Sequence, residues 1–190
     1  EHMYHHSISS LSNLFSAFNL NFYDAKQVNI QKGSILGFVT KNIFKDKTEE
    51  IFKLKNIEKK KGYISNKKFD DLRKFIINQQ KEAKRIIKRF DKNKIGSYGS
   101  ARSGPTYALN FSLSKYIKFI FDDHPLKVNK FTSFLNIKVR PTKDIIKIKP
   151  FLLIILAYLH SKKIIKNNLN YLKNDGAFLL VYPKITLVNK

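Results

Sequence analysis

The first forty residues alternate between polar and apolar positions in a way that predicts one helix followed by two strands. Within residues 7–18 the apolar side chains fall on a single helical stripe, and Ser7 stands where an N-cap belongs. Residues 22–29 and 34–40 are extended segments joined through Lys32 and Gly33, which indicates an antiparallel pair. Because a helix and a hairpin cannot close a core by themselves, we interpret this part as the trailing edge of a larger sheet.

The next fifty residues have a helical rather than an extended period. Residues 48–61 and 66–90 carry apolar side chains three and four positions apart, and the second run is amphipathic. Gly62 separates the two runs, and Ser65 or Asn66 is placed to cap the second helix. We therefore predict a helical connector that packs on the domain after it.

From residue 94 onward, strand and helix patterns alternate. The two strongest strand candidates are continuous apolar runs, as expected for strands that are buried on both faces between helices. The expected fold is therefore α/β: a small Rossmann-like open parallel sheet with helices on both faces, preceded by the helix–hairpin and the long connector helices. Strands are expected at residues 94–98, 116–121, 136–139, 151–156 and 177–182, and helices at 103–110, 142–147 and 161–173.

Composition narrows the classes of function. The chain has 37 basic and 14 acidic residues and a net charge of +23, yet five of the basic residues are arginines. Base readout favours arginine, which is scarce here, and the lysines are spread along the chain. This distribution indicates a solvated lysine surface, so nucleic acid is not the expected partner. The absence of cysteine excludes a disulfide scaffold or thiolate metal site within this chain. No apolar run approaches the roughly 20 residues that a membrane span needs.

The loop from Tyr98 to Thr106 is the first candidate site. It leaves a predicted strand and enters a predicted helix, where free backbone N–H groups and the positive helix end favour an anion. Its glycines permit close backbone approach, and Arg102 can grip an anionic oxygen. The spacing fits neither the dinucleotide fingerprint nor a P-loop, so phosphate binding and an ordinary tight turn both stay open.

Polar side chains also follow two other predicted strands. Asp122 and Asp123 come after the second strand, where an acidic side chain often meets a ribose hydroxyl, although they could equally shape the turn before Pro125. His160 follows the fourth strand, at the carboxyl edge where α/β folds bind ligands. It fits a ligand contact and a residue at the start of the next helix equally well.

Glu1 and His2 form the third candidate. A carboxylate beside an imidazole can orient it, which would make His2 a general base near neutral pH. A metal site would combine His2 with His5 or His6, but no third protein ligand stands nearby, so no metal is expected. Without further context, a frayed terminal segment fits these residues as well.

Six short blocks follow one another along nearly the whole chain. They are Glu1-His2 with Ser7, Lys32-Gly33-Ser34-Ile35-Leu36, Tyr98-Gly99-Ser100-Ala101-Arg102-Ser103-Gly104-Pro105-Thr106 with Asn110, Asp122-Asp123-His124-Pro125-Leu126-Lys127, Leu156-Ala157-Tyr158-Leu159-His160, and Asp175-Gly176-Ala177-Phe178 with Pro183. In this order they resemble motifs of the nucleoside diphosphate-sugar C-methyltransferases, which use S-adenosylmethionine to methylate a carbon of keto-deoxysugars. Two positions depart from the family: Arg102 replaces its lysine, and Leu159 replaces its asparagine.

The resemblance implies three parts: an N-terminal zinc-binding module, a central donor-binding Rossmann domain, and a C-terminal domain that helps to hold the nucleotide-sugar. Residues 1–42 would be the C-terminal edge of a truncated methyltransferase domain, 43–92 a helical connector, and 93–190 the Rossmann-like C-terminal domain. S-adenosylmethionine would then bind outside this chain, and zinc would belong to the N-terminal module. A chain that starts at Glu1 is expected to be a fragment or a processed product, inactive by itself.

The resemblance also implies roles for individual residues. His2 would remove the proton next to the sugar ketone, Glu1 would orient His2, and the enolate would take up the methyl group on carbon. The expected contacts of the nucleotide-sugar are Tyr98, Ser100, Arg102, Ser103, Thr106, Lys127 and His160. The alternatives are a standalone α/β nucleotide- or phosphate-binding module and, with less support, a basic nucleic-acid-binding protein. The expected location is the cytoplasm, without a membrane partner.

Overall fold

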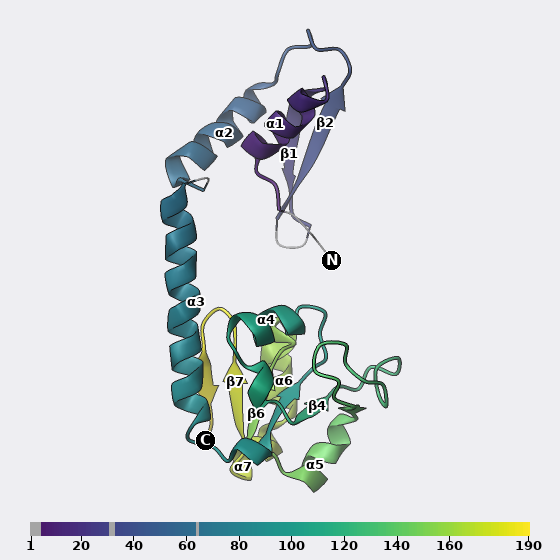
Figure 1. Ribbon diagram of the computed structural model, residues 1–190. Helices are drawn as coiled ribbons and strands as arrows, with labels where there is room; N and C mark the ends of the chain where they lie inside the picture. The colour runs from purple at the N-terminus through teal and green to yellow at the C-terminus, as the bar shows by residue number, and fades with distance from the viewer. Residues whose placement is uncertain (1–4, 31–32, 64) are drawn as a thin grey trace. The chain divides into compact units, whose positions relative to one another are not determined.

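A computed structural model describes residues 5–30, 33–63 and 65–190 of the chain. The chain forms two compact units, the first ending at Asp71 and the second running from Leu72 to Lys190 (Figure 1). Within the described residues, no helix has the length and apolar character needed to cross a membrane.

The first unit is an antiparallel hairpin with two helices packed on it. The helix and the hairpin predicted from the sequence are both confirmed, and the second helix closes a small core with them. That core contains apolar residues of three elements: Ile8, Phe22, Ala25 and Ile51. The elements are α1 (Ile8–Ala17), β1 (Asn21–Val28), β2 (Ser34–Thr40) and α2 (Glu49–Lys61).

Two sets of polar contacts hold the start of α1. Ser7 forms the expected cap as a capping box, in which its hydroxyl accepts from the Ser10 N–H and its own N–H donates to the Ser10 hydroxyl. Glu58 of α2 is 8% exposed, and its carboxylate accepts from the N–H groups of Ile8 and Ser9 at 2.5 and 3.1 Å. The Ser9 hydroxyl donates to the same carboxylate at 2.8 Å. These bonds satisfy a buried charge and tie α1 to α2.

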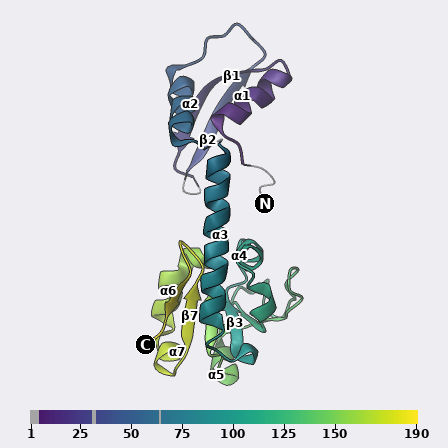
Figure 2. The same ribbon diagram turned by 60° about the vertical axis from the view of Figure 1, so that its left-hand side comes forward.

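The long amphipathic helix predicted after residue 66 is α3 (Asn66–Ile87). Residues 66–75 are exposed, whereas Ala83, Ile86 and Ile87 are buried in the core of the second unit. Figure 2 shows the C-terminal part of α3 crossing one face of the sheet of this unit. The prediction that this helix packs on the following domain is therefore confirmed for its C-terminal part.

The second unit is built on a six-stranded, mostly parallel sheet with the order β5-β4-β3-β6-β7-β8. Five strands are parallel, and the last pairs antiparallel with β7. Numbered within the unit, the order is 3-2-1-4-5-6, which is the Rossmann arrangement and confirms the expected fold class. The strands are β3 (Ile95–Tyr98), β4 (Phe119–Phe121), β5 (Val139–Arg140), β6 (Leu152–Ile155), β7 (Ala177–Leu180) and β8 (Thr186–Val188).

Helices cover both faces of this sheet, because side chains of its central strand β6 are apolar and buried on both faces. Along β6, Leu152 and Ile154 pack on the face covered by α3 and α4 (Gly104–Asn110), and the intervening Leu153 and Ile155 pack on the opposite face. All four side chains are fully buried. The helices of the second face are α5 (Ile145–Ile148), α6 (Ser161–Asn167) and α7 (Leu169–Lys173).

Several details differ from the sequence prediction. The strand expected at residues 136–139 is β5, of which only Val139 falls within the expected range. The short strand β8 was not predicted, and the helix expected at residues 161–173 is divided at Asn168, where φ is −123°. The start of the strand expected at 116–121 is instead the end of a 3₁₀ turn, and the helix expected at 142–147 begins with another. The 3₁₀ turns are η1 (Lys92–Lys94), η2 (Ser114–Tyr116), η3 (Thr142–Asp144) and η4 (Tyr158–His160).

Candidate functional site

The carboxyl ends of β3 and β6 meet where the strand order reverses, the place at which doubly wound sheets bind ligands. Gly99, directly after β3, has φ of +89° and donates its N–H to the Phe121 carbonyl at 2.7 Å. A Cβ placed on Gly99 would lie 2.5 Å from the Cβ of Ala157, which follows β6. Glycine is therefore required here both by the backbone conformation and by the close approach of the two loops.

Asp122, directly after β4, holds the next residue of the glycine loop. Its carboxylate accepts from the Ser100 N–H at 2.7 Å and from the His124 N–H at 2.9 Å. The Lys127 ammonium lies 3.4 Å from the same carboxylate and donates to the Ser100 carbonyl at 2.9 Å. Ser100, Asp122 and Lys127 thus form a closed network at the carboxyl edge.

The charge state of this network follows from its contacts. Burial by itself would raise the pKa of the Asp122 carboxyl group, but hydrogen bonds from the His124 and Ser100 N–H groups and the charge of Lys127 outweigh it. The pKa of Asp122 is therefore lowered from its ordinary value, and the group is a carboxylate at neutral pH. Both oxygens of Asp122 already accept hydrogen bonds from backbone N–H groups. These contacts favour a role of Asp122 in shaping the turn over a contact with a ribose hydroxyl.

The neighbouring carboxylate, Asp123, holds a different loop. It accepts from the N–H of Thr142 at 2.8 Å and from the Thr142 hydroxyl at 2.5 Å, and so fixes the start of η3 after β5. The two adjacent carboxylates therefore organise the loops on either side of β4.

A pocket of about 480 Å³ opens at this edge on the side of β4 and β5. Of the predicted contacts, Tyr98, Lys127 and His160 line it, together with His124 and Thr142. The carboxylates in its wall are already hydrogen-bonded, whereas Lys127 has three N–H donors and directs two of them at protein oxygens. The lining therefore holds charges of both signs, and Lys127 is the group in it that could bind an anion.

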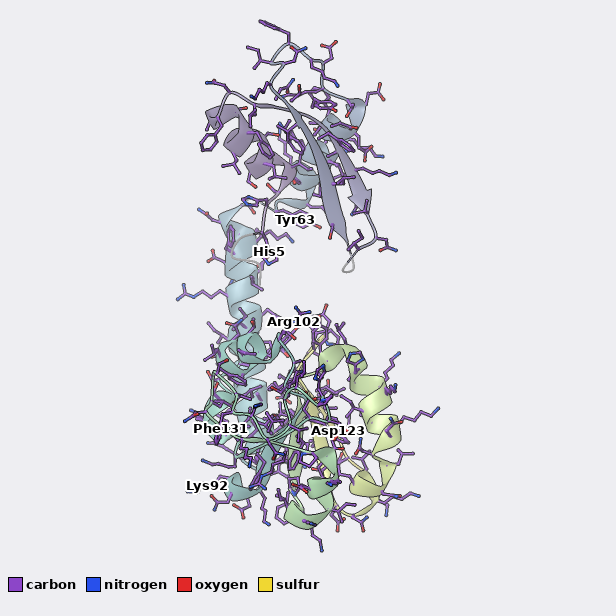
Figure 3. The ribbon with its side chains drawn as sticks, turned by 90° about the vertical axis from the view of Figure 1, so that its right-hand side faces the viewer. His5, Tyr63, Lys92, Arg102, Asp123 and Phe131 are labelled. Atoms are coloured by element: carbon purple, nitrogen blue, oxygen red, sulfur yellow. The ribbon has the colours of Figure 1, made fainter. Side chains whose placement is uncertain are left out.

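The remaining predicted contacts lie outside the lining of this pocket. Ser100 contributes through its backbone, to Asp122 and Lys127. Arg102 and Thr106 are exposed, and Ser103 is the half-buried residue that precedes α4. Figure 3 shows Arg102 and Asp123 on different loops of the second unit. Tyr98, Lys127 and His160 therefore line one pocket, whereas Arg102, Ser103 and Thr106 lie at the start of α4.

Glu1 and His2 lie outside the described residues, so their predicted roles stay predictions. His5 and His6, which the sequence offered as further metal ligands, are exposed. In the part of the chain that the structure describes, no three histidine or acidic side chains are grouped to hold a metal ion.

S-adenosylmethionine does not fit the glycine loop of the second unit. The spacing of its glycines departs from the dinucleotide fingerprint, and Asp122 is committed to two N–H groups and Lys127. We therefore assign no described residue of this edge to the methyl donor.

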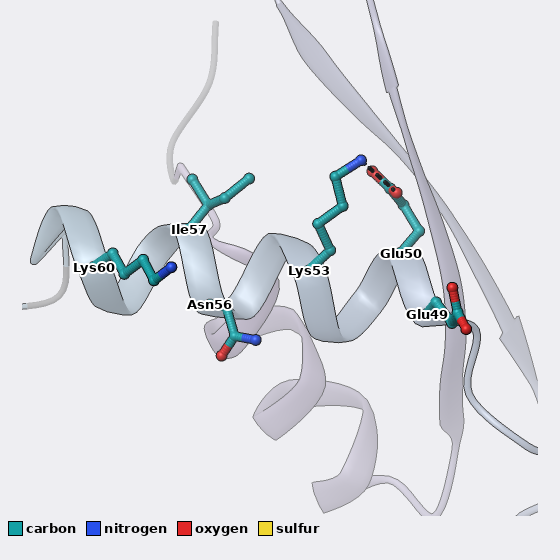
Figure 4. A pocket seen from close by; sticks show the side chains of 6 residues that line it. All are labelled: Glu49, Glu50, Lys53, Asn56, Ile57 and Lys60. Carbon is teal, nitrogen blue, oxygen red and sulfur yellow. Dashed lines mark hydrogen bonds and ion pairs between the residues drawn. The ribbon is translucent and has the colours of Figure 1, made fainter.

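A second depression, of about 550 Å³, lies along α2 in the first unit. Figure 4 shows that its lining comes from a single helix, where Lys53 pairs with Glu50 at 3.3 Å. Both partners are substantially exposed, and an exposed pair of this kind contributes little. The depression is therefore an ordinary helix surface.

The second unit therefore has a Rossmann-like sheet with a pocket at its switch point, the place where α/β domains bind ligands. The chain belongs to the family of C-methyltransferase C-terminal domains, whose sequence profile matches residues 29–183. No curated protein matches the chain in sequence. Family membership assigns the chain to a methyltransferase, a class of enzyme that generally uses S-adenosylmethionine.

Proposed function

We propose that the chain is the C-terminal portion of an S-adenosylmethionine-dependent C-methyltransferase that acts on a nucleotide-linked keto-sugar. The family supports the methyltransferase class, and Lys127 in the pocket wall supports an anionic acceptor. One observation carries the proposal of a diphosphate ligand. The Lys127 ammonium is fixed in the pocket wall by Ser100 and Asp122, with one N–H donor left for a phosphate oxygen.

The chemistry of the acceptor follows from its carbonyl group. A ketone acidifies the neighbouring C–H, and a general base near neutral pH can remove that proton to give an enolate whose carbon accepts a methyl group. In our proposal His2 is this base, Glu1 orients it, and S-adenosylmethionine binds outside the described residues. A standalone phosphate-binding module would bind the same ligand, but methylation would not depend on His2.

Calorimetric titration with a thymidine diphosphate-sugar tests the binding half of this proposal. The chain should bind the ligand, and Lys127→Gln should weaken binding by about tenfold or more, since hydrogen bonds between charged groups contribute about 1.5–3 kcal/mol. Lys130→Gln is the matched control, because it removes the same charge from an exposed position three residues away.

Circular dichroism would establish that both variants keep the fold. Binding that is absent from the folded wild-type chain, or equally weakened by the two substitutions, would contradict a diphosphate site at Lys127.

A further inference from the structure

Three tyrosines converge at the carboxyl edge of the sheet from three separate segments. Tyr107 lies on α4 after β3, Tyr158 lies in η4 after β6, and Tyr182 follows β7. The ring centroids of Tyr158 and Tyr182 are 4.9 Å apart, and those of Tyr107 and Tyr158 are 5.2 Å apart. Tyr107 and Tyr182 are separated by 6.4 Å, so each ring contacts the other two. We call this group the tyrosine cluster.

The tyrosine cluster lies next to the pocket that contains Lys127. Ala157 lines the pocket and packs against Gly99, and the next residue, Tyr158, belongs to the cluster. Lys127 and Thr142 come from the segments after β4 and β5, whereas Tyr182 comes from the segment after β7. The carboxyl edge therefore has a charged side and an aromatic side that meet at the Gly99–Ala157 contact.

Part of the tyrosine cluster is exposed to solvent. Tyr182 is 49% exposed, while Tyr107 and Tyr158 are half-buried. Burial, with a smaller contribution from Tyr158, raises the pKa of Tyr107 to about 12, so this phenol is uncharged at neutral pH. Neutral aromatic rings with accessible faces bind planar rings by stacking, whatever their detailed substitution.

We propose that the exposed ring of Tyr182, supported by Tyr158, is a stacking platform for the nucleobase of a nucleoside diphosphate whose phosphates lie at Lys127. The rings of Tyr158 and Tyr182 are inclined at 58° to each other, so the base would stack on Tyr182 alone. This inference rests on the proposed function, because it takes the pocket to bind a diphosphate. It adds that the aromatic side of the edge recognises the base. A ligand that is planar and uncharged at one end and anionic at the other matches the two sides of the edge.

Titrations of the full chain with thymidine diphosphate and with inorganic pyrophosphate distinguish binding of the base from binding of the phosphates. The wild type should bind thymidine diphosphate about tenfold or more tighter than pyrophosphate, because stacking of one base contributes about 1–3 kcal/mol. Tyr182→Leu removes the aromatic face and should lower thymidine diphosphate affinity toward that of pyrophosphate, whose own affinity should not change. Tyr182→Phe keeps the ring and should bind like the wild type.

The possible outcomes distinguish failure of the stacking platform from failure of the proposed diphosphate site. If the wild type binds both ligands equally, or if Tyr182→Leu leaves thymidine diphosphate binding unchanged, the platform is wrong while the phosphate site stands. If the folded wild type binds neither ligand, the proposed function fails and the platform fails with it. Thermal melting of both Tyr182 variants shows that each measurement is made on folded protein.

Discussion

Gly99 and Ala157 set how closely the loops after β3 and β6 approach each other. The backbone of Gly99 is in a region that side chains rarely adopt, and a Cβ there would overlap Ala157. Gly99→Ala should therefore destabilise the chain by about 3 kcal/mol, the sum of a backbone cost and a steric cost. Urea unfolding would measure the loss.

A double substitution separates those two costs. Ala157→Gly removes the atom that the new methyl group would meet, so Gly99→Ala combined with Ala157→Gly should recover about 1–2 kcal/mol of the loss. The remainder is the backbone cost, which the second substitution cannot relieve. Strictly additive effects of the two substitutions would show that the two loops do not touch.

At the scale of single residues, sequence position predicted the site through one rule. Tyr98 ends one strand of a parallel sheet and His160 follows another, so both were expected at its carboxyl edge, and both line the pocket. The contact between Lys127 and the Ser100 carbonyl was beyond this rule, because it joins side chain and backbone across a crossover. The same holds for Asp122, whose hydrogen bonds to the Ser100 and His124 N–H groups could not be predicted from sequence position.

Helix α1 depends on a residue far away in the chain. The Glu58 carboxylate accepts three hydrogen bonds at the start of α1, so its replacement leaves buried donors unsatisfied. Glu58→Gln should lower the free energy of unfolding by about 1–3 kcal/mol, measured by urea denaturation.

Glu49→Gln is the control for this substitution. It makes the same chemical change at an exposed position of the same helix and should alter stability by less than about 0.5 kcal/mol. Equal effects of the two substitutions would indicate a general loss of negative charge, and no role for Glu58 at the start of α1.

At the scale of elements, the predictions succeeded where periodicity was strong. The continuous apolar run that became β6 and the amphipathic run that became α3 have the expected types. The strand β8 was missed because it has three residues and gains its stability from pairing with β7, which no local pattern reveals. The break at Asn168 was missed because apolar spacing continues across it, while the Asn168 side chain bonds back to the Ile164 carbonyl.

The strand order belongs to the whole molecule and could not be predicted from any segment. Alternating strands and helices indicated a parallel sheet, but several orders satisfy the same pattern. The observed order places β3 and β6 at the centre, and the loops that follow them at one edge. That arrangement brings together the charged and aromatic sides of the candidate site from five separate segments of the chain.

Net charge is also a property of the whole molecule. It allows a test of whether the chain binds nucleic acid through charge alone. At +23 the chain will attract any polyanion, and such binding weakens steeply with salt because counterions are released. We expect affinity for a single-stranded oligonucleotide to fall about a hundredfold or more between about 50 and 200 mM salt, measured by fluorescence anisotropy. Affinity for thymidine diphosphate, which neutralises few charges, should fall about tenfold or less over the same range.

Polyglutamate provides the control for this comparison, because it is a polyanion without bases. If charge alone governs oligonucleotide binding, polyglutamate should compete with the oligonucleotide and show a similarly steep dependence on salt. Oligonucleotide binding that persists at about 200 mM salt, resists polyglutamate and discriminates between base sequences would instead require base contacts. It would then favour a nucleic-acid-binding protein over a nucleotide-sugar methyltransferase.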